Sequence, residues 1–236
     1  MHRRELGDNL VALATQGSFV RGDDREFSDV ELVAFLQTVP AARRWADIVQ
    51  IWDGMLFDVV WTTKDEYIAR VKEVTPDWYL AGSDRLGPLV NDELIAEVNA
   101  YQPADLRDKC RRQALAHWPV TQEATGKVLN ALARESAVDL GRLFFSMLDN
   151  VLIDLAFLNA RPYTSSSSSL QEALRMPEQP RGFDEFAAVA IDGAYTDLRR
   201  TEATVHTVFA ALEELFEAHD MTLYTPDLAL RRVDRP

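Results

Sequence analysis

The sequence predicts an α+β fold in which a sheet with flanking helices is followed by a bundle of helices. The strand signals lie before Pro103, where two apolar runs are joined by Asp53-Gly54, a strong hairpin signal. From Pro103 onward the apolar residues recur at helical spacing and the strand signals disappear. We therefore expect two domains, the first covering residues 1–102 and the second covering residues 103–236.

The length and composition support folded domains with a proper core. The chain has 236 residues, of which 47% are hydrophobic, and this argues against a disordered chain. No apolar run approaches the ~18 residues that span a bilayer, and no apolar stretch follows Met1 to Arg4, so we expect neither a membrane segment nor a signal peptide. Cys110 is the only cysteine, which excludes an intramolecular disulfide and a cysteine-based zinc cluster. A cytoplasmic protein is the simplest interpretation.

The charge balance of the chain is strongly acidic. With 38 acidic side chains against 25 basic ones, the formal net charge is −13. This disfavours nonspecific binding to nucleic acid, whose affinity comes mostly from Lys and Arg on phosphates. It suits a polycationic ligand, which a negative cleft attracts, although solubility alone also explains such a charge.

The first half contains the predicted strands. Its first residues, Met1 to Asn9, leave room for at most a turn or two of helix. The strand runs are Leu10 to Leu13, Leu32 to Leu36 (which Val39-Pro40 ends), Ala46 to Trp52 and Met55 to Trp61. Thr63 and Glu66 form a capping-box pattern, which predicts a helix that runs to about Glu73. The run Gly87-Pro88-Leu89-Val90 interrupts the remaining part of this half.

The second half contains six predicted helices. They cover Ala104 to His117, Val120 to Ala137, Val138 to Leu158, Leu170 to Met176, Phe183 to Ile191 and Thr196 to His219. Pro119 separates the first two, since proline interrupts the interior of a helix. Ser169 with Glu172 forms another capping-box pattern, so we interpret the preceding serine run as an ordered loop that leads into a helix.

The stretch from Gly17 to Glu31 reads GSFVRGDDREFSDVE and is typical of a strand, a turn that begins with Gly17-Ser18, and a second strand. Because side chains alternate along a strand, Asp29 and Glu31 would project from the same face. Two adjacent carboxylates repel each other and usually need a cation between them, and Mg²⁺ with substrate phosphates suits such ligands. Gly17 lets backbone N–H groups approach a phosphate, and Ser18 and Arg21 add donors.

A third carboxylate stands alone in an apolar strand. Asp58 is flanked by Leu56-Phe57 on one side and by Val59-Val60-Trp61 on the other. An ionised carboxylate in such surroundings is costly unless it is paired or binds a metal ion. A solvent-facing position on an edge strand is the alternative, but beside Asp29 and Glu31 we interpret Asp58 as a metal ligand.

Gly-Ser, a short gap and an acidic-x-acidic pair on the next strand form the pattern of the polymerase-β-like nucleotidyltransferases. The segment from Gly17 to Leu32 resembles most the kanamycin nucleotidyltransferase branch of that superfamily, which shares the Arg, the gap before Ser-Asp, and Glu as the second acid. The resemblance implies a mixed five-stranded sheet packed on a helical bundle, and a homodimer whose active sites lie between subunits. It also implies a third carboxylate where Asp58 stands, although that branch has Glu there. On this resemblance the triphosphate would be bound by Gly17, Ser18, Arg21, Ser28 and Lys127, and Mg²⁺ by Asp29, Glu31 and Asp58.

Glu123 and Lys127 lie four residues apart and therefore share one face of a predicted helix. By itself this spacing is typical of a surface ion pair. However, Glu-x-x-Gly-Lys resembles the segment of the kanamycin nucleotidyltransferase branch that holds the general base and a lysine in contact with phosphate. The resemblance implies that Glu123 accepts the proton of the substrate hydroxyl and that Lys127 neutralises charge on the phosphates.

Together these features predict an aminoglycoside O-nucleotidyltransferase, which would take a nucleoside monophosphate from Mg²⁺-ATP or another triphosphate, attach it to a drug hydroxyl and release pyrophosphate. The acidic charge fits this acceptor, because aminoglycosides carry several ammonium groups. The alternatives are a lincosamide or a protein hydroxyl as acceptor, the latter as in small antitoxin nucleotidyltransferases, or an idle family member that binds a partner. Arg112 and His117 have the spacing of HEPN-type ribonuclease toxins, but His117 before Trp118-Pro119 fits a helix-end residue better.

Overall fold

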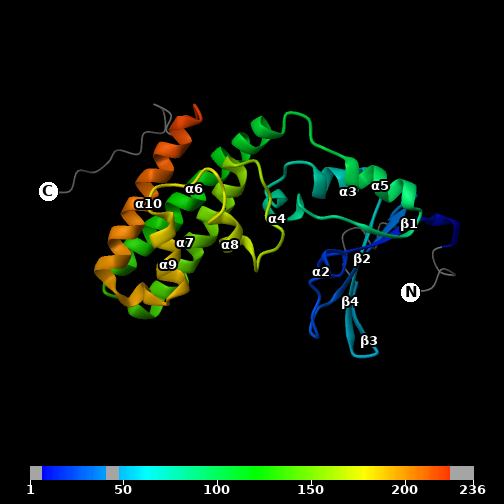
Figure 1. Cartoon of the computed structure of the whole chain (residues 1–236), viewed down its shortest axis with the longest axis horizontal. Helices are drawn as coiled ribbons and strands as arrows, with labels where there is room; N and C mark the ends of the chain where they lie inside the picture. The colour runs from blue at the N-terminus through cyan, green and yellow to red at the C-terminus, as the bar shows by residue number, and fades with distance from the viewer. Residues whose placement is uncertain (1–6, 41–47, 224–236) are drawn as a thin grey trace. The chain divides into compact units, whose positions relative to one another are not determined.

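The computed structural model describes residues 7–40 and 48–223, and it divides into two compact units, Met1–Leu106 and Arg107–Pro236, each of which is described by itself (Figure 1). The first unit contains a mixed sheet with helices and the second contains helices, so the predicted α+β fold is confirmed. The domain boundary between residues 102 and 103 stays a prediction. The part of the predicted helical turn before residue 7, and the predicted strand residues Ala46 and Asp47, lie outside the described residues.

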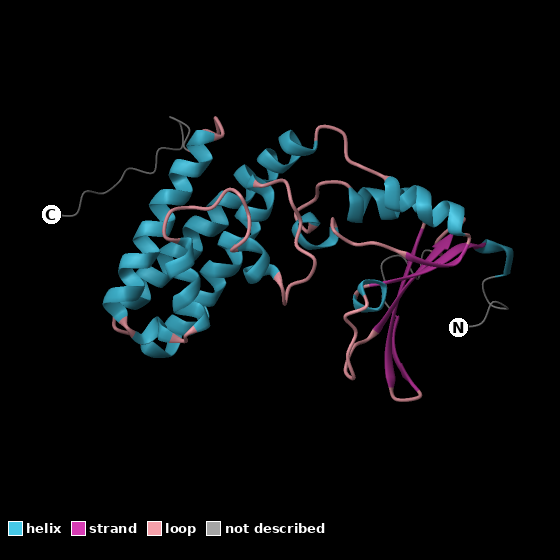
Figure 2. Ribbon diagram, in the orientation of Figure 1, coloured by secondary structure: helices cyan, strands magenta, loops and turns pink. Residues whose placement is uncertain are grey.

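The strands of the first unit form one sheet, drawn in magenta in Figure 2. It has five strands in the order β3-β4-β2-β1-β5. The strands are β1 (Leu10–Gln16), β2 (Val30–Leu36), β3 (Ile48–Trp52), β4 (Met55–Thr62) and β5 (Gly87–Val90). β2 and β4 pair in parallel, whereas the other neighbouring strands pair antiparallel. The predicted mixed five-stranded sheet is thus confirmed.

Local chemistry explains the hairpin and the edge of this sheet. The turn between β3 and β4 has positive φ at Asp53 (50°) and at Gly54 (78°), the backbone that a two-residue hairpin turn requires. β5 is missing from the predicted strands because Pro88 lies inside it. The strand is at the edge of the sheet, where the N–H group that proline lacks is not needed for a second neighbour.

The described part of the first unit also contains short helical segments: η1 (Gly7–Asn9), α2 (Ser18–Arg21), α3 (Lys64–Tyr67), η3 (Ile68–Lys72), α4 (Trp78–Ala81) and α5 (Asp92–Ala100). α5 was not among the predicted helices. It begins at Asn91, whose side chain accepts a hydrogen bond from Leu94 N at 3.2 Å, and its residues Ile95 and Val98 are buried against the sheet. The core that they join consists of Ala12, Ala14, Val33, Phe35, Tyr67, Leu86, Ile95 and Val98.

The capping box at Thr63 and Glu66 is confirmed, since each side chain bonds to the backbone of the other residue. The predicted helix through about Glu73 is confirmed in its extent, since α3 and η3 together run from Lys64 to Lys72, but its second part, η3, is a π-helix. Lys72 ends η3 and is buried, and its Nζ donates to the backbone oxygen of Asp84. This wider helical turn accompanies a buried lysine that the apolar periodicity does not reveal.

The second unit consists of α6 (Leu106–Ala133), α7 (Ala137–Leu158), α8 (Ser169–Ala173), α9 (Phe183–Ile191), η4 (Ala194–Thr196) and α10 (Leu198–Ala218). The predicted break at Pro119 was wrong, because α6 continues through it. Proline inside a helix costs roughly 3 kcal/mol, but the neighbouring Trp118 is buried and its ring lies 5.2 Å from Phe209 and 4.9 Å from Phe216 on α10. This packing holds the helix together across the proline.

The capping box predicted at Ser169 and Glu172 was also wrong. The N-cap of α8 is Ser168, and the Glu172 carboxylate accepts from the Ser168 hydroxyl at 2.5 Å and from the backbone N of Thr164 at 3.1 Å. The predicted interpretation of the serine run as an ordered loop before a helix is confirmed, because these bonds tie that loop to α8.

His117 is not a helix-end residue as predicted, because it lies within α6 and contacts α7. Its Nδ1 lies 2.8 Å from Oδ1 of Asp154, and the hydroxyl of Thr121 donates to Oδ2 of Asp154 at 2.6 Å. Asp154 is fully buried, so this polar cluster connects α6 and α7 inside the helical unit. None of the helices within residues 7–40 and 48–223 is both long enough and apolar enough to cross a membrane.

Candidate functional site

Gly17 and Glu31 lie in direct contact where the chain leaves β1 toward β2. Gly17 has φ of +72°, and a Cβ built on it would lie 1.6 Å from Oε2 of Glu31. A side chain at this position would therefore strain the backbone and force the Glu31 carboxylate to move. The predicted turn after Gly17 is a single helical turn, α2, in which Arg21 N donates to Gly17 O at 3.3 Å and Gly22 N donates to Ser18 O at 2.9 Å.

The three predicted metal ligands come from adjacent parts of β2 and β4. Glu31 lies within β2, and Asp29 directly precedes that strand. In the parallel pair of β2 and β4, Glu31 is the register partner of Asp58, so the two side chains leave the same face of the sheet. On the other side of β2, Gln16 is the register partner of Glu31. The fold thus places Asp58 next to the acidic pair, as the sequence predicted.

The surroundings of Glu31 disfavour its charged form. Burial raises the pKa of the Glu31 carboxyl, and the carboxylates of Asp29, Asp84 and Asp58 raise it further, whereas a hydrogen bond with Gln16 acts in the opposite direction. A cation placed among these oxygens would relieve the repulsion. The donor chemistry fits Mg²⁺, which prefers hard oxygen ligands.

Within residues 7–40 and 48–223 no group of three or more acidic, histidine or cysteine side chains lies in an arrangement that could by itself hold a metal ion. This does not conflict with the donor chemistry, because Mg²⁺ usually binds through one or two carboxylates while substrate phosphates and water complete its shell. The roles of Asp29, Glu31 and Asp58 as metal ligands stay predictions.

Ser28 and Arg21 take part in the loop that joins α2 to β2. The Oγ of Ser28 accepts from Arg25 N at 2.9 Å, and Ser28 N donates to Arg25 O at 2.9 Å, so Ser28 closes its own turn. The Nε of Arg21 donates to Oδ2 of Asp23 at 3.3 Å. A guanidinium has five N–H donors, so this bond leaves Arg21 able to bind a second partner.

The sequence analysis missed two residues beside Glu31. Asp84 lies in the stretch before β5, and Tyr67 ends α3 with its ring edge-on to Phe35. The Tyr67 hydroxyl is buried, and within the described part of the chain it has no hydrogen-bond partner. Burial raises the pKa of Tyr67, and the nearby carboxylates of Asp84 and Glu31 raise it further. No local signal marks Asp84, because its place beside Glu31 depends on the path of the chain over the sheet.

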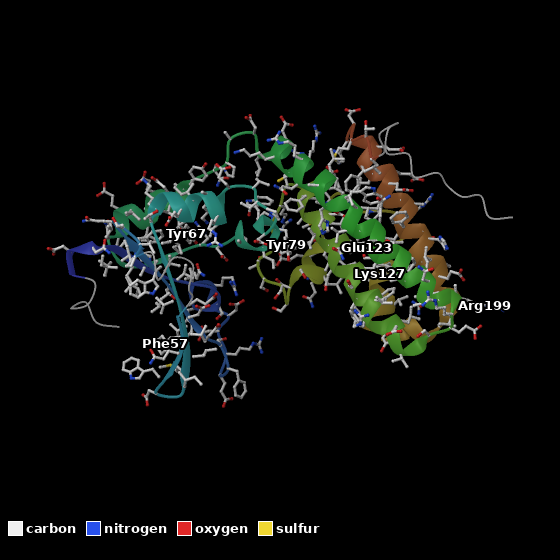
Figure 3. The ribbon with its side chains drawn as sticks, turned by 180° about the vertical axis from the view of Figure 1, so that it is seen from behind. Phe57, Tyr67, Tyr79, Glu123, Lys127 and Arg199 are labelled. Atoms are coloured by element: carbon white, nitrogen blue, oxygen red, sulfur yellow. The ribbon has the colours of Figure 1, made fainter. Side chains whose placement is uncertain are left out.

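Glu123 and Lys127 lie one turn apart on α6 (Figure 3). Their side chains form an ion pair of 2.8 Å and are 66% and 57% exposed, as expected of a surface pair. The hydrogen bond from Lys127 and its charge lower the pKa of Glu123, so the carboxylate is ionised at neutral pH. Lys127 also lines a small cavity with Asn130 and Arg134. The two units are described separately, so the structure places this pair only within the helical unit.

The chain is similar to a known protein family and to a known enzyme. The model of the KNTase C-terminal domain family matches residues 103–222. Over 231 residues the chain is 19% identical to the aminoglycoside nucleotidyltransferase (4') of Staphylococcus aureus, and the match covers 91% of this chain and 85% of that relative. The first match lies in the helical half, whereas the second extends over both halves.

Proposed function

The chain belongs to the KNTase C-terminal domain family, and on this premise we propose that it is an aminoglycoside O-nucleotidyltransferase of the kanamycin nucleotidyltransferase branch. Both comparisons support a nucleotidyltransferase enzyme. The observation that carries the proposal is the pair of carboxylates on Glu31 and Asp58 beside the Gly17 backbone. Such a pair offers ligands for a cation directly next to a turn that a phosphate can approach.

The donor substrate in this proposal is a nucleoside triphosphate with Mg²⁺, most simply ATP. Asp29, Glu31 and Asp58 would hold the ion, which neutralises charge on the phosphates and activates the attacking oxygen when bound. Backbone N–H groups of the turn at Gly17 and Ser18 would face the phosphates. The remaining donors for the triphosphate would be the side chains of Ser18, Arg21, Ser28 and Lys127.

The acceptor in this proposal is a hydroxyl group of the drug. Its oxygen attacks the α-phosphorus, the bond from that phosphorus to the β-phosphate oxygen breaks, and pyrophosphate leaves. The proton of the hydroxyl passes to the Glu123 carboxylate, which is ionised at neutral pH and whose pKa is lowered by Lys127. Lys127 would then neutralise charge on the phosphates.

Two further observations support a cationic acceptor. The formal net charge of −13 suits a substrate with several ammonium groups. The relative from Staphylococcus aureus is named for an aminoglycoside. We further propose, on the resemblance alone, a homodimer in which Glu123 of one subunit serves the carboxylates of its partner.

Incubation of the purified protein with labelled ATP and Mg²⁺ against a panel of acceptors tests this function. We expect an aminoglycoside to gain the mass of one nucleoside monophosphate, with stoichiometric release of pyrophosphate. The panel includes lincosamides as the matched alternative and the protein itself as a possible acceptor of label. Labelling of a lincosamide or of protein, with no aminoglycoside modified, would show that the acceptor belongs to that other class. Absence of nucleotide binding would reject the proposed function.

A further inference from the structure

A cavity of about 210 Å³ lies where α6 ends and α7 begins, wholly within the helical unit. Glu135 in the turn between the two helices has φ of 54°, and its N–H donates to Leu132 O at 3.0 Å. The N–H of Ser136 donates to Ala131 O, also at 3.0 Å. These two bonds form a Schellman motif, which closes the C-terminus of a helix. The backbone of this corner is therefore fixed.

The lining of this cavity has an excess of positive charge. Lys127 and Asn130 lie on one face of α6, three residues apart, and Arg134 directly follows the last residue of that helix. The other lining residues are Ala131, Ser136, Asp139 and Leu143. Two cations and one acid thus line the cavity, in a chain whose formal net charge is −13. A local excess of positive charge on an acidic protein attracts an anion to that place.

Three side chains of the cavity have donors available for a ligand. The guanidinium of Arg134 and the amide of Asn130 have no hydrogen-bond or ion-pair partner among residues 7–40 and 48–223. The acid of the lining, Asp139, accepts from the serine hydroxyl of the lining at 3.3 Å and forms no ion pair with Arg134. Lys127 is paired with Glu123 at 2.8 Å (Figure 3), but its ammonium group has three N–H donors and can contact an anion as well.

These donors and the size of the cavity fit phosphate groups. Arginine and lysine bind phosphate oxygens through charge-assisted hydrogen bonds, and an amide adds neutral N–H donors. Pockets that enclose a whole drug-sized ligand have volumes of about 300–1,000 Å³, so this smaller cavity accommodates only part of a nucleotide. We propose that it binds the β- and γ-phosphates of the nucleoside triphosphate, with Asn130 and Arg134 as phosphate-binding residues beside Lys127. This inference rests on the proposed function, in which Lys127 contacts the phosphates and pyrophosphate leaves.

Calorimetric titration of the full-length protein with pyrophosphate and Mg²⁺ tests this inference. We expect Arg134→Gln to raise the Kd of pyrophosphate about tenfold, because a charged donor is lost. Arg111→Gln is the matched control, since it removes the same charge from an exposed pair with Asp108 on the same helix, and we expect less than about a twofold change. Asn130→Asp places a negative charge in the cavity and should also weaken binding. It serves as the test variant if Arg134→Gln does not fold. Wild-type affinity in both cavity variants, or no binding of pyrophosphate to the wild-type protein, would overturn the inference.

A comparison of two nucleotides separates a phosphate contact from general damage to the helical unit. Arg134→Gln should raise the Kd of a non-hydrolysable ATP analogue about as much as that of pyrophosphate. The Kd of AMP, which lacks the β- and γ-phosphates, should change less than about twofold. Equal losses for the two nucleotides would overturn the inference. If pyrophosphate binding depends on Arg134 but no acceptor gains a nucleotide, the phosphate site stands and only the proposed function fails. If transfer occurs and pyrophosphate binding does not depend on Arg134, only this inference fails.

Discussion

Glu31 on β2 and Asp58 on β4 are register partners in the only parallel strand pair formed within residues 7–40 and 48–223. In parallel strands the register fixes both the neighbour and the face, so the two carboxylates leave the sheet side by side. A hairpin between these strands is impossible, and β3 must therefore run back between them in the sequence. The turn at Asp53-Gly54 sets the register of β3 against β4, in which Asp58 lies opposite Val49.

Replacing Asp58 by Asn removes one negative charge from this pair without changing its volume. We expect the transfer rate at saturating Mg²⁺ to fall by at least about tenfold, because a ligand for the ion is lost. The thermal midpoint should not fall, since the like charge beside Glu31 disappears. Asp58→Glu is the control, because it restores the charge and should retain more activity. A rate above a tenth of wild type in Asp58→Asn would remove Asp58 from the metal site.

Gly17 and Gly22 offer a matched pair of glycine substitutions. Both have φ of +72°, but a Cβ on Gly17 would overlap Oε2 of Glu31, whereas a Cβ on Gly22 would meet nothing within 4 Å. Gly22→Ala should therefore cost only the backbone strain, roughly 1–2 kcal/mol of unfolding free energy. Gly17→Ala should cost more and should abolish transfer, because Glu31 is displaced.

Urea unfolding and transfer assays on the two glycine variants measure this difference. Equal stability and equal activity in both would show that the close approach of Gly17 to Glu31 is not needed for the site. Loss of activity in Gly22→Ala alone would place the critical contact at the other end of α2.

The sequence revealed the parts of the site that depend on local chemistry. Gly17, Asp29 and Glu31 are recognisable because one turn and the strand after it determine their spacing. Asp58 is recognisable because it is the single acid among apolar residues. Asp84 was missed for the opposite reason. It stands in a stretch without periodicity, and only the bonds from Lys72 and the packing of β5 bring it to Glu31.

At Pro119 the packing of the helix overrides the local rule that proline breaks a helix. A proline in a helix interior removes one backbone hydrogen bond and predicts a break, but a single lost bond is small beside the burial of Trp118 against two rings of α10. The same long-range packing determines His117, whose partner Asp154 is 37 residues away in the sequence. No spacing rule connects the two.

Asp154→Ala should destabilise the helical unit strongly. It removes the hydrogen-bond partner of both His117 and Thr121 from a fully buried position, and breaking a buried pair of this kind costs about 3–5 kcal/mol. The control is Asp139→Ala at the start of the same helix, where the carboxylate is exposed and accepts from Ser136 at 3.3 Å. Urea unfolding gives both free energies. A loss below about 1 kcal/mol in Asp154→Ala would mean that the cluster contributes no more than a surface bond.

Two inactive variants should restore activity when they are combined, if the active sites are shared between subunits. Coexpression of Asp29→Asn with Glu123→Gln should return about a quarter of the wild-type rate, because half of randomly paired dimers are mixed and each regains one of its two sites. Each variant expressed alone is the control and should be inactive. Sizing as a monomer with full activity in the wild-type protein would reject the shared site.

Glu123→Gln separates the surface pair from the general base. As half of an exposed ion pair with Lys127, Glu123 could be replaced with almost no effect on the rate. As the base, its loss should lower kcat by roughly 10²–10⁴-fold, the usual range for a positioned proton acceptor. The Kd of the nucleotide should change little, since the base acts on the acceptor hydroxyl and not on the triphosphate.

The control for Glu123→Gln is Asp108→Asn, which removes the acid of another exposed pair on α6, with Arg111 at 3.8 Å. Its kcat should equal that of the wild type. Because Lys127 lowers the pKa of Glu123, the base stays ionised below the ordinary range of a carboxyl group. Lys127→Met should therefore move the acidic limb of the kcat profile to higher pH, besides weakening nucleotide binding. An unchanged kcat in Glu123→Gln would show that Glu123 is only part of a surface ion pair, and the base would have to be another group.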